Sequence, residues 1–287
     1  MEKNWVIKAQ GEEGIVSALI RDLGIDRPLA HLLAQRGVNT YDDARSFFRP
    51  DLANLHDPFL MKDMDVAVDR ILSAINSGEK VLVYGDYDVD GTSAVALIYS
   101  FFKDHFRTVD YYIPDRYEEG YGVSLKGIDF AAQEGFSLII ALDCGIKAVD
   151  KIEYARSKGV EFIICDHHNP GEAIPSAIAV LDPKQPGCPY PFKELSGCGV
   201  GLKLAQAFCM RMGLPEERVF CYLDLVVVSI ASDIVPITGE NRILAHFGLK
   251  KLNDDPSMGL KAIREVAGIE CREIDIEDIV FKIGPRI

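Results

Sequence analysis

The sequence predicts an α/β fold: a mostly parallel sheet sandwiched by helices, preceded by a small helical N-terminal region. From residue 79 onward, short runs of Val, Ile and Leu alternate with longer helical patterns. Continuous apolar runs of this length are typical of strands that are buried on both faces. The 287 residues are 48% hydrophobic, which supplies a sizeable core. We expect a helical N-terminal region at 1–78, an α/β metal-binding domain at 79–240 and a helical connector at 241–287.

Residues 1–78 carry helical patterns interrupted by glycine. The segments 16–24 and 29–37 each end at a glycine, which favours a helix C-terminus there. Residues 65–77 have apolar residues at helical spacing and predict a third helix. Two interpretations of this region stay open, a structural cap on the next domain and an adaptor that handles substrate.

Six short apolar runs are candidate strands of the predicted sheet. They cover residues 81–84, 109–113, 138–142, 161–165, 177–181 and 225–230. Helices fit between or after them, at 93–102, 125–134, 148–158, 201–212, 242–252 and 258–267. In such sheets ligands bind beyond the carboxyl ends of the strands. The residues that directly follow the apolar runs are therefore the candidates for function.

Four small clusters of acid and histidine occur where apolar runs end. They are Asp86-Tyr87-Asp88-Val89-Asp90, Leu142-Asp143, Asp166-His167-His168 and Ser232-Asp233. Bringing carboxylates and imidazoles together costs free energy through repulsion and lost hydration, and a divalent cation offsets both effects. The carboxylate-rich ligand set favours Mg²⁺ or Mn²⁺. Two such ions, about 3.5–4 Å apart, activate water for phosphoester hydrolysis. The clusters therefore predict a two-metal site.

The local spacing within the clusters suggests roles. In an extended segment the three alternating acids of the first cluster would face one cavity, and residues 92–93 would cap the next helix. A calcium loop is disfavoured, because its twelfth position holds Leu97 and a strand precedes it. In the third cluster, one imidazole can bind a metal and the other a phosphate oxygen, while Asp166 fixes a ring tautomer. The absence of a glycine-rich phosphate loop disfavours an ATPase.

Charge and cysteine content restrict the class of protein further. Thirty-one Lys and Arg against 44 Asp and Glu give a net charge of −13, which at first disfavours a nucleic-acid partner. Six of the acids belong to the clusters, however, and two divalent ions would offset about four charges. The seven cysteines are odd in number and never form a Cys-x-x-Cys pair, so reduced thiols are expected. We expect a soluble cytoplasmic protein without a membrane span.

The clusters, in their order, resemble the four metal motifs of the DHH phosphoesterase superfamily, which takes its name from a motif such as Asp166-His167-His168. Within that superfamily the chain resembles the RecJ exonucleases over essentially its whole length. The stretches that carry this resemblance are 84–93, 113–122, 195–205 and 231–236, which runs into 239–242. The superfamily's pyrophosphatases do not share several of them.

The resemblance implies a hydrolase that removes nucleotides from the five-prime end of single-stranded DNA in recombination and repair, with Mn²⁺ or Mg²⁺. A single-strand-binding protein and a helicase would be further partners. The implied metal ligands are Asp86, Asp88, Asp90, Asp143, His167 and Asp233. His168 would contact the scissile phosphate or assist the leaving group, and Asp166 would orient a histidine. Arg116 and Arg286 would contact phosphate groups.

In the family, the Gly-Pro-Arg-Ile stretch at residues 284–287 normally continues toward a second domain, called DHHA1, and an oligonucleotide-binding fold. The expectation is therefore a fragment that binds metal and shows weak or no processive nuclease activity. One alternative function is a DHH phosphoesterase for oligonucleotides, cyclic dinucleotides or a nucleoside bisphosphate. Another is a non-catalytic replisome scaffold. The sequence leaves open the metal, the strand polarity and the choice between DNA and RNA.

Overall fold

The structure is a computed structural model that describes residues 6–269 and 272–287. The chain forms two compact units, Met1–Asn54 and Leu55–Ile287. Among the described helices, none combines the length and the apolar content that crossing a membrane requires.

The first unit is a small helical bundle. Its helices are α1 (Glu13–Leu23), α2 (Arg27–Ala34) and α3 (Tyr41–Phe48), followed by the short 3₁₀ turn η1 (Leu52–Asn54). Val16 and Leu19 of α1 pack with Ala30 and Leu33 of α2 in a common core. Both helices that the glycine pattern predicts are present; α1 is capped by Gly24 as predicted, whereas α2 ends at Ala34, before Gly37. Helix α3 was not predicted, although Thr40 and Asp43 carry the spacing of a capping box.

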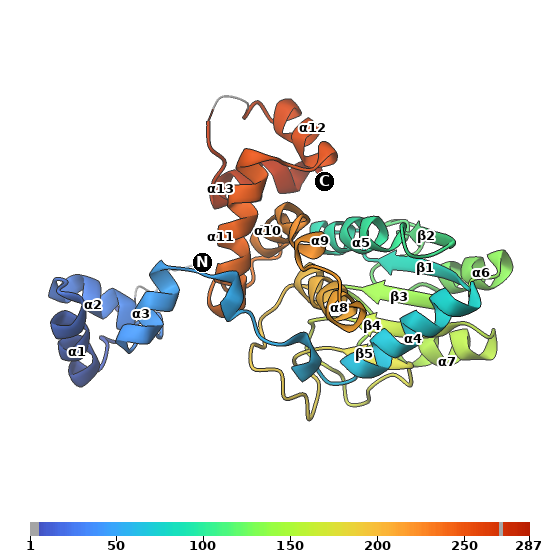
Figure 1. Cartoon of the computed structure of the whole chain (residues 1–287), viewed down its shortest axis with the longest axis horizontal. Helices are drawn as coiled ribbons and strands as arrows, with labels where there is room; N and C mark the ends of the chain where they lie inside the picture. The colour runs from blue at the N-terminus through green and yellow to red at the C-terminus, as the bar shows by residue number, and fades with distance from the viewer. Residues whose placement is uncertain (1–5, 270–271) are drawn as a thin grey trace. The chain divides into compact units, whose positions relative to one another are not determined.

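The second unit is built on a five-stranded parallel sheet. Its strands are β1 (Lys80–Gly85), β2 (Thr108–Tyr112), β3 (Leu138–Leu142), β4 (Glu161–Cys165) and β5 (Ala179–Leu181). The strand order is β2-β1-β3-β4-β5, and every neighbouring pair is parallel (Figure 1). The chain therefore leaves β1 toward one side of the sheet and returns to the other side at β3. This reversal opens a crevice at the carboxyl ends of β1 and β3, where doubly wound sheets bind their ligands.

Helices cover both faces of the sheet, which confirms the predicted α/β fold. The helices that pack around it are α4 (Met64–Ser77), α5 (Val89–Phe102), α6 (Leu125–Glu134), α7 (Val149–Ser157) and α8 (Gly197–Met212). Leu82 and Tyr84 of β1 share a core cluster with Ile128 of α6 and Ile152 of α7. On the other face, α5 packs against β1 and α8 packs against β3. Successive residues of β1, β3 and β4 alternate between these faces, so nearly all of them are apolar, whereas the edge strand β2 is mostly exposed.

A second group of helices completes the unit. It contains α9 (Glu217–Phe220), α10 (Leu223–Ser232), α11 (Gly239–Asp254), α12 (Met258–Val266) and α13 (Ile276–Asp278), with the short turns η2 (Pro58–Leu60), η3 (Ile279–Ile283) and η4 (Gly284–Arg286). The predicted strand at 225–230 is wrong, because these residues lie in α10. This helix packs against α5, α8 and α11 and is buried nearly all round. Its apolar run therefore has no helical periodicity that would distinguish it from a buried strand.

Residues 55–78 belong with the sheet in the observed division of the chain. The reason is α4, which packs against β5 and α8. The predicted domain boundaries at residues 78 and 240 stay predictions.

Candidate metal centre

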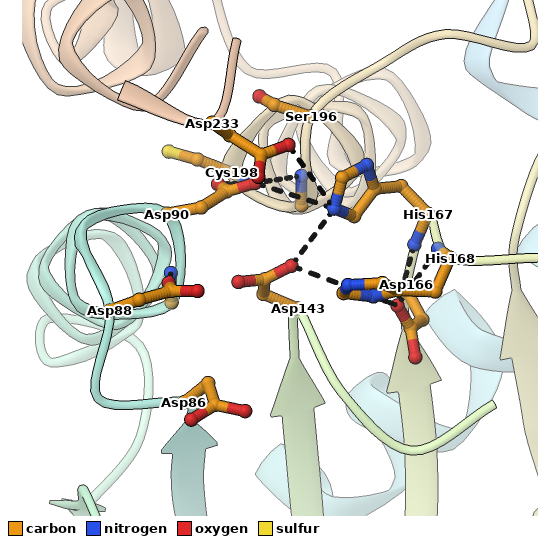
Figure 2. Close-up of polar contacts among 12 residues, drawn as sticks. Asp86, Asp88, Asp90, Asp143, Asp166, His167, His168, Ser196, Cys198 and Asp233 are labelled. Atoms are coloured by element: carbon orange, nitrogen blue, oxygen red, sulfur yellow. Dashed lines mark hydrogen bonds and ion pairs between the residues drawn. The ribbon is translucent and has the colours of Figure 1, made fainter. Parts of the chain in front are cut away.

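The acid and histidine clusters meet at the carboxyl edge of the sheet, beside the crevice between β1 and β3. Asp86 follows β1, Asp143 follows β3 and Asp166 follows β4. Asp233 ends helix α10, so the prediction that all four clusters follow strands is wrong for the last one. In Figure 2 the carboxylates of Asp143 and Asp233 point toward the ring of His167.

His167 lies at the centre of this arrangement. Its Nε2 is 3.1 Å from Asp143 Oδ1 and 3.6 Å from both Asp90 Oδ2 and Asp233 Oδ2. Two groups of three residues have possible ligand atoms within 4.8 Å of one another: Asp90, His167 and Asp233, and Asp143, His167 and His168. The two groups share one imidazole, as adjacent metal positions with a common ligand would.

Asp143 is buried without hydrogen-bond donors. Neither of its carboxylate oxygens has a hydrogen-bond partner among the described residues, although the His167 ring is close. Burial and the charges of Asp90 and Asp88 raise the pKa of Asp143 well above its ordinary value. Its φ of 58° lies in the left-handed region, which a non-glycine residue adopts at a cost. A buried carboxylate without hydrogen-bond donors, on a residue with a strained backbone, fits a cation ligand.

Asp90 is held by the amino terminus of helix α8. Its carboxylate accepts hydrogen bonds from the backbone N–H groups of Gly197 and Cys198, both at 2.7 Å, and from Ser229 Oγ at 2.7 Å. These donors fix the carboxylate and favour its charged form, although burial raises its pKa. The donors leave Asp90 Oδ2 within 3.6 Å of His167 Nε2.

The first cluster is not extended, contrary to the prediction. Asp88 is the N-cap of α5 and accepts from the N–H of Gly91 at 2.9 Å, while Asp90 already lies in the first helical turn. Asp88 therefore takes the capping role that was predicted for residues 92–93. Asp86 turns elsewhere, and its two oxygens accept from the N–H groups of Tyr87 and Gly122, both at 2.8 Å.

Asp166 organises the histidine pair. Its Oδ1 lies 2.7 Å from His168 Nδ1 and accepts from the N–H of His167, while its Oδ2 accepts from the N–H of Ile146. Burial alone would raise the pKa of Asp166, but the contacts with His168 lower it. The same hydrogen bond raises the pKa of His168. Burial lowers the pKa of His167, which favours the neutral imidazole that a metal binds.

The sequence comparison with known families is consistent with this geometry. The family model described as "DHH family, N-terminal domain" matches residues 80–230, which is more than half of the chain. The chain belongs to the DHH family. The match covers the sheet of the second unit and the first three clusters, and it ends within α10, just before Asp233.

Within the DHH family, the chain is similar to exonucleases named RecJ. The chain is 40% identical to the single-stranded-DNA-specific exonuclease RecJ of Bacillus subtilis (strain 168) over 283 residues, which cover 99% of this chain and 35% of that protein. The crystal structure of RecJ in complex with Mn²⁺ from Thermus thermophilus matches with a TM-score of 0.79 and 26% identity, over 97% of this chain and 39% of that one. A crystal structure of exonuclease RecJ bound to manganese matches with a TM-score of 0.72 and 32% identity, over 83% of this chain and 58% of that one.

The structure of this DHH-family chain separates the predicted site residues. Asp90, Asp143, His167, His168 and Asp233 lie in the two possible metal groups. Asp86 and Asp88 border them without belonging to either group, and Asp166 supports His168. The two predicted phosphate contacts also lie outside these groups. Arg116 is exposed, with its Cζ 5.2 Å from the Tyr87 ring centroid, and Arg286 donates to the carbonyl oxygen of Lys282.

Sequence reasoning missed residues that hold or border the site. Tyr121 donates from its hydroxyl to Asp88 Oδ2 at 3.0 Å, and its ring centroid is 6.4 Å from that of His168. Asp182 follows β5, is fully buried, and has a pKa that burial raises to about 7. Its position after an apolar run was the same signal that singled out the other acids. The N–H donors of Gly197 and Cys198 are backbone groups, so their side chains gave no signal.

Proposed function

We propose that this chain provides the metal-binding core of an exonuclease that hydrolyses single-stranded DNA from the five-prime end, with Mn²⁺ or Mg²⁺. The observation that carries the proposal is the pair of three-residue groups that share His167, one of which contains the unsatisfied carboxylate of Asp143. The chain spans 35% and 48% of the length of two curated RecJ relatives, so the activity is proposed by comparison with longer proteins.

The residues of the site would divide the chemistry between them. Asp90, Asp143, His167 and Asp233 would hold the metal ions. When bound, such ions supply a water of lowered pKa and offset the charge of the phosphate. The position of His168, whose ring is held by Asp166 and is partly exposed, suits contact with a phosphate oxygen or a leaving oxygen. Asp86 and Asp88, which border the two groups, stay proposed as further ligands.

The aromatic and cationic groups beside the site favour a nucleotide substrate. Tyr87 and Tyr121 meet edge to face, with ring centroids 5.6 Å apart, and the Arg116 guanidinium lies over the Tyr87 ring. Such groups bind bases by stacking and phosphates by charge. Arg116 is therefore proposed to contact phosphate. The likeness to RecJ supports four further proposals. Arg286 would contact phosphate, a single-strand-binding protein and a helicase would be partners, and the protein would be cytoplasmic.

The test is Mn²⁺-dependent release of nucleotides from end-labelled single-stranded DNA, with duplex DNA of the same sequence in parallel. We expect products only with metal, preferentially from the single strand and from the five-prime end. The Asp143→Asn variant, verified as folded by circular dichroism, should form no product. Equal hydrolysis by Asp143→Asn, or equal hydrolysis of the duplex, would contradict the proposal.

A second candidate function, hydrolysis of a small phosphoester, is favoured by one cavity. It has a volume of about 360 Å³ beside Asp143 and His168, and Lys147 and Lys151 lie in its lining. That volume falls within the range of small-ligand sites, about 300–1,000 Å³. Faster turnover of a dinucleotide than of long single-stranded DNA would support this function over the first.

A further inference from the structure

One face of helix α3, in the first unit, presents aromatic rings and guanidinium groups together. Tyr41, Arg45 and Phe48 are spaced by four and three residues, so they lie on one side of the helix, and Arg49 lies beside them. Tyr41 is 53% exposed and Phe48 is 61% exposed. Ala44 of the same helix is buried in the unit's core, so packing does not require the two exposed rings.

The two arginines of this α3 face differ from the others in the unit. Arg21 pairs with Asp22, and Arg27 pairs with Glu13. Arg45 and Arg49 have no ion pair or side-chain hydrogen bond within the described residues. They line a polar depression of about 480 Å³ along the helix. Its other lining residues are Asp42, Ser46, Pro50, Asp51 and Asn54.

The α3 face is held in place by local contacts. Thr40 and Asp43 form a capping box that fixes the first turn of the helix. The ring of Phe47 meets that of Phe48 edge-on, with centroids 5.1 Å apart and an interplanar angle of 87°. The contact restrains the Phe48 ring, which is still 61% exposed, so that a flat partner would meet it at a reduced entropic cost of binding.

The charge of the unit allows a polyanion to approach but does not attract it strongly. Residues 1–54 hold seven Lys and Arg against eight Asp and Glu, whereas the remaining residues hold 24 against 36. Within the depression, Asp42 and Asp51 balance Arg45 and Arg49. Phosphate contacts at this face would therefore be few, and stacking on the rings would contribute most of the affinity.

We propose that the α3 face binds a single-stranded polynucleotide, with bases on Tyr41 and Phe48 and one or two phosphates on Arg45 and Arg49. The proposal takes its substrate class from the proposed function and adds a second contact, remote in sequence from the metal centre. An acidic peptide would also pair with the arginines. It offers no row of flat surfaces to two exposed rings, and the face therefore favours the polynucleotide.

The test is fluorescence anisotropy of a labelled oligothymidylate of about 20 nucleotides, titrated with the whole chain in EDTA so that no hydrolysis occurs. Tyr41→Ala with Phe48→Ala should weaken binding at least about tenfold, because each stacked base contributes about 1–3 kcal/mol. Arg45→Gln with Arg49→Gln should reduce the slope of log K against log salt by about 0.7 to 1.4, since each single-strand phosphate contributes about 0.7. Arg45→Lys with Arg49→Lys should keep the slope.

Two matched controls remove similar groups elsewhere in the unit. Arg27→Gln removes a charge that is already paired, and Leu32→Ala removes an apolar side chain that is 46% exposed on α2. Both should bind as the unaltered chain does, and circular dichroism should show every variant folded. Equal weakening by the controls, unchanged binding by the α3 variants, or a preference for a poly-glutamate peptide over the oligonucleotide would overturn the proposal.

Hydrolysis in the same preparations separates this inference from the proposed function. Asp143→Asn should abolish Mn²⁺-dependent hydrolysis while keeping the binding that the α3 variants lose. If hydrolysis is intact but the α3 variants bind normally, only the proposal for the α3 face is refuted. If the α3 face contributes to binding but no metal-dependent hydrolysis occurs, only the proposed nuclease function is refuted.

Discussion

A Cβ atom added at Gly197 would lie 2.6 Å from the Cβ of Asp143 and 2.7 Å from its Oδ1. The helix that donates to Asp90 and the strand end that carries Asp143 are therefore in direct contact at this glycine. No side chain fits between them.

Gly197→Ala should displace Asp143 and weaken Mn²⁺ binding by more than about tenfold, with a loss of stability of about 1–3 kcal/mol from overpacking. Gly201→Ala in the same helix is the control, because its nearest atoms would be 3.4 Å away. That change should keep metal affinity and add about 0.5–1 kcal/mol of stability. Calorimetric titration with Mn²⁺ and urea unfolding measure both effects. Equal metal affinity in the two variants would contradict the role of the contact.

Asp143→Asn should raise the stability of the metal-free chain while removing its response to Mn²⁺. The reason is the buried carboxyl group, whose ionisation is opposed by burial and by Asp90 and which the amide replaces with a group of similar shape that cannot ionise. Thermal unfolding should show a Tm increase of at least about 2 °C in EDTA. Asp254→Asn, at an exposed position, should change neither quantity. A lower Tm for Asp143→Asn in EDTA would show that the carboxylate stabilises the metal-free fold.

The stability of the metal-free chain should fall as the pH rises from about 4 to about 7. Burial raises the pKa of Asp86 to about 6 and that of Asp233 to about 7, above their ordinary value of 3.8. The folded state therefore binds protons more tightly, and this advantage disappears as pH passes the folded pKa. The raised pKa of His168 acts in the same direction, and the lowered pKa of His167 acts in the opposite one.

Urea unfolding in EDTA at several pH values measures this dependence. Asp86→Asn with Asp233→Asn should reduce its slope, and the remainder comes from Asp143 and Asp182, whose pKa values burial also raises, and from the histidines. Mn²⁺ should reverse the dependence, because the ion binds the deprotonated ligands. An unchanged slope in the double variant would rule out these two acids as its source.

The buried pair of Lys203 and Glu240 should matter more for stability than exposed pairs do. Lys203 Nζ lies 2.8 Å from Glu240 Oε1, and both side chains are almost fully buried. Lys203→Met leaves an unpaired buried carboxylate and should cost about 3–5 kcal/mol in urea unfolding. Adding Glu240→Leu should recover part of the loss. The exposed pair of Lys126 and Glu118 is the control, and Lys126→Ala should cost less than about 1 kcal/mol.

Asp166→Asn should lower the pKa of His168. The carboxylate accepts from His168 Nδ1 at 2.7 Å and stabilises its charged form. Nuclear magnetic resonance titration of the imidazole Cε1–H signals measures the shift, with His168→Gln to assign the signal. His31, in the first unit, serves as the internal reference. A pKa of His168 that stays the same would show that Asp166 acts only on the backbone.

The strands could be predicted from sequence where burial on both faces makes every residue apolar. The prediction for β3 at 138–142 has the observed bounds, and the same argument placed Asp143 at the edge of the sheet. It failed for 225–230, because a helix enclosed by α5, α8 and α11 produces the same apolar run. Local sequence does not contain the tertiary contacts that distinguish these cases.

The site could be predicted as a set of acids and histidines but not as a geometry. The alternation of Asp86, Asp88 and Asp90 predicted three carboxylates that face one cavity. Helix α5 begins at Val89, however, so the three side chains point in different directions. The partners of Asp90 come from residues more than 100 positions away. Backbone donors and left-handed φ angles leave no mark on side-chain chemistry, so only the folded chain reveals them.

The reversal of winding between β1 and β3 has a consequence for how such a chain can change over time. The crevice exists because the chain leaves β1 and β3 toward opposite sides of the sheet, and this depends on the strand order and not on particular side chains. The acids and histidines provide the chemistry at the crevice, but they do not determine its shape. Replacing them should therefore alter or abolish the chemistry while the shape of the crevice persists, so that one framework is open to new substrates through few substitutions.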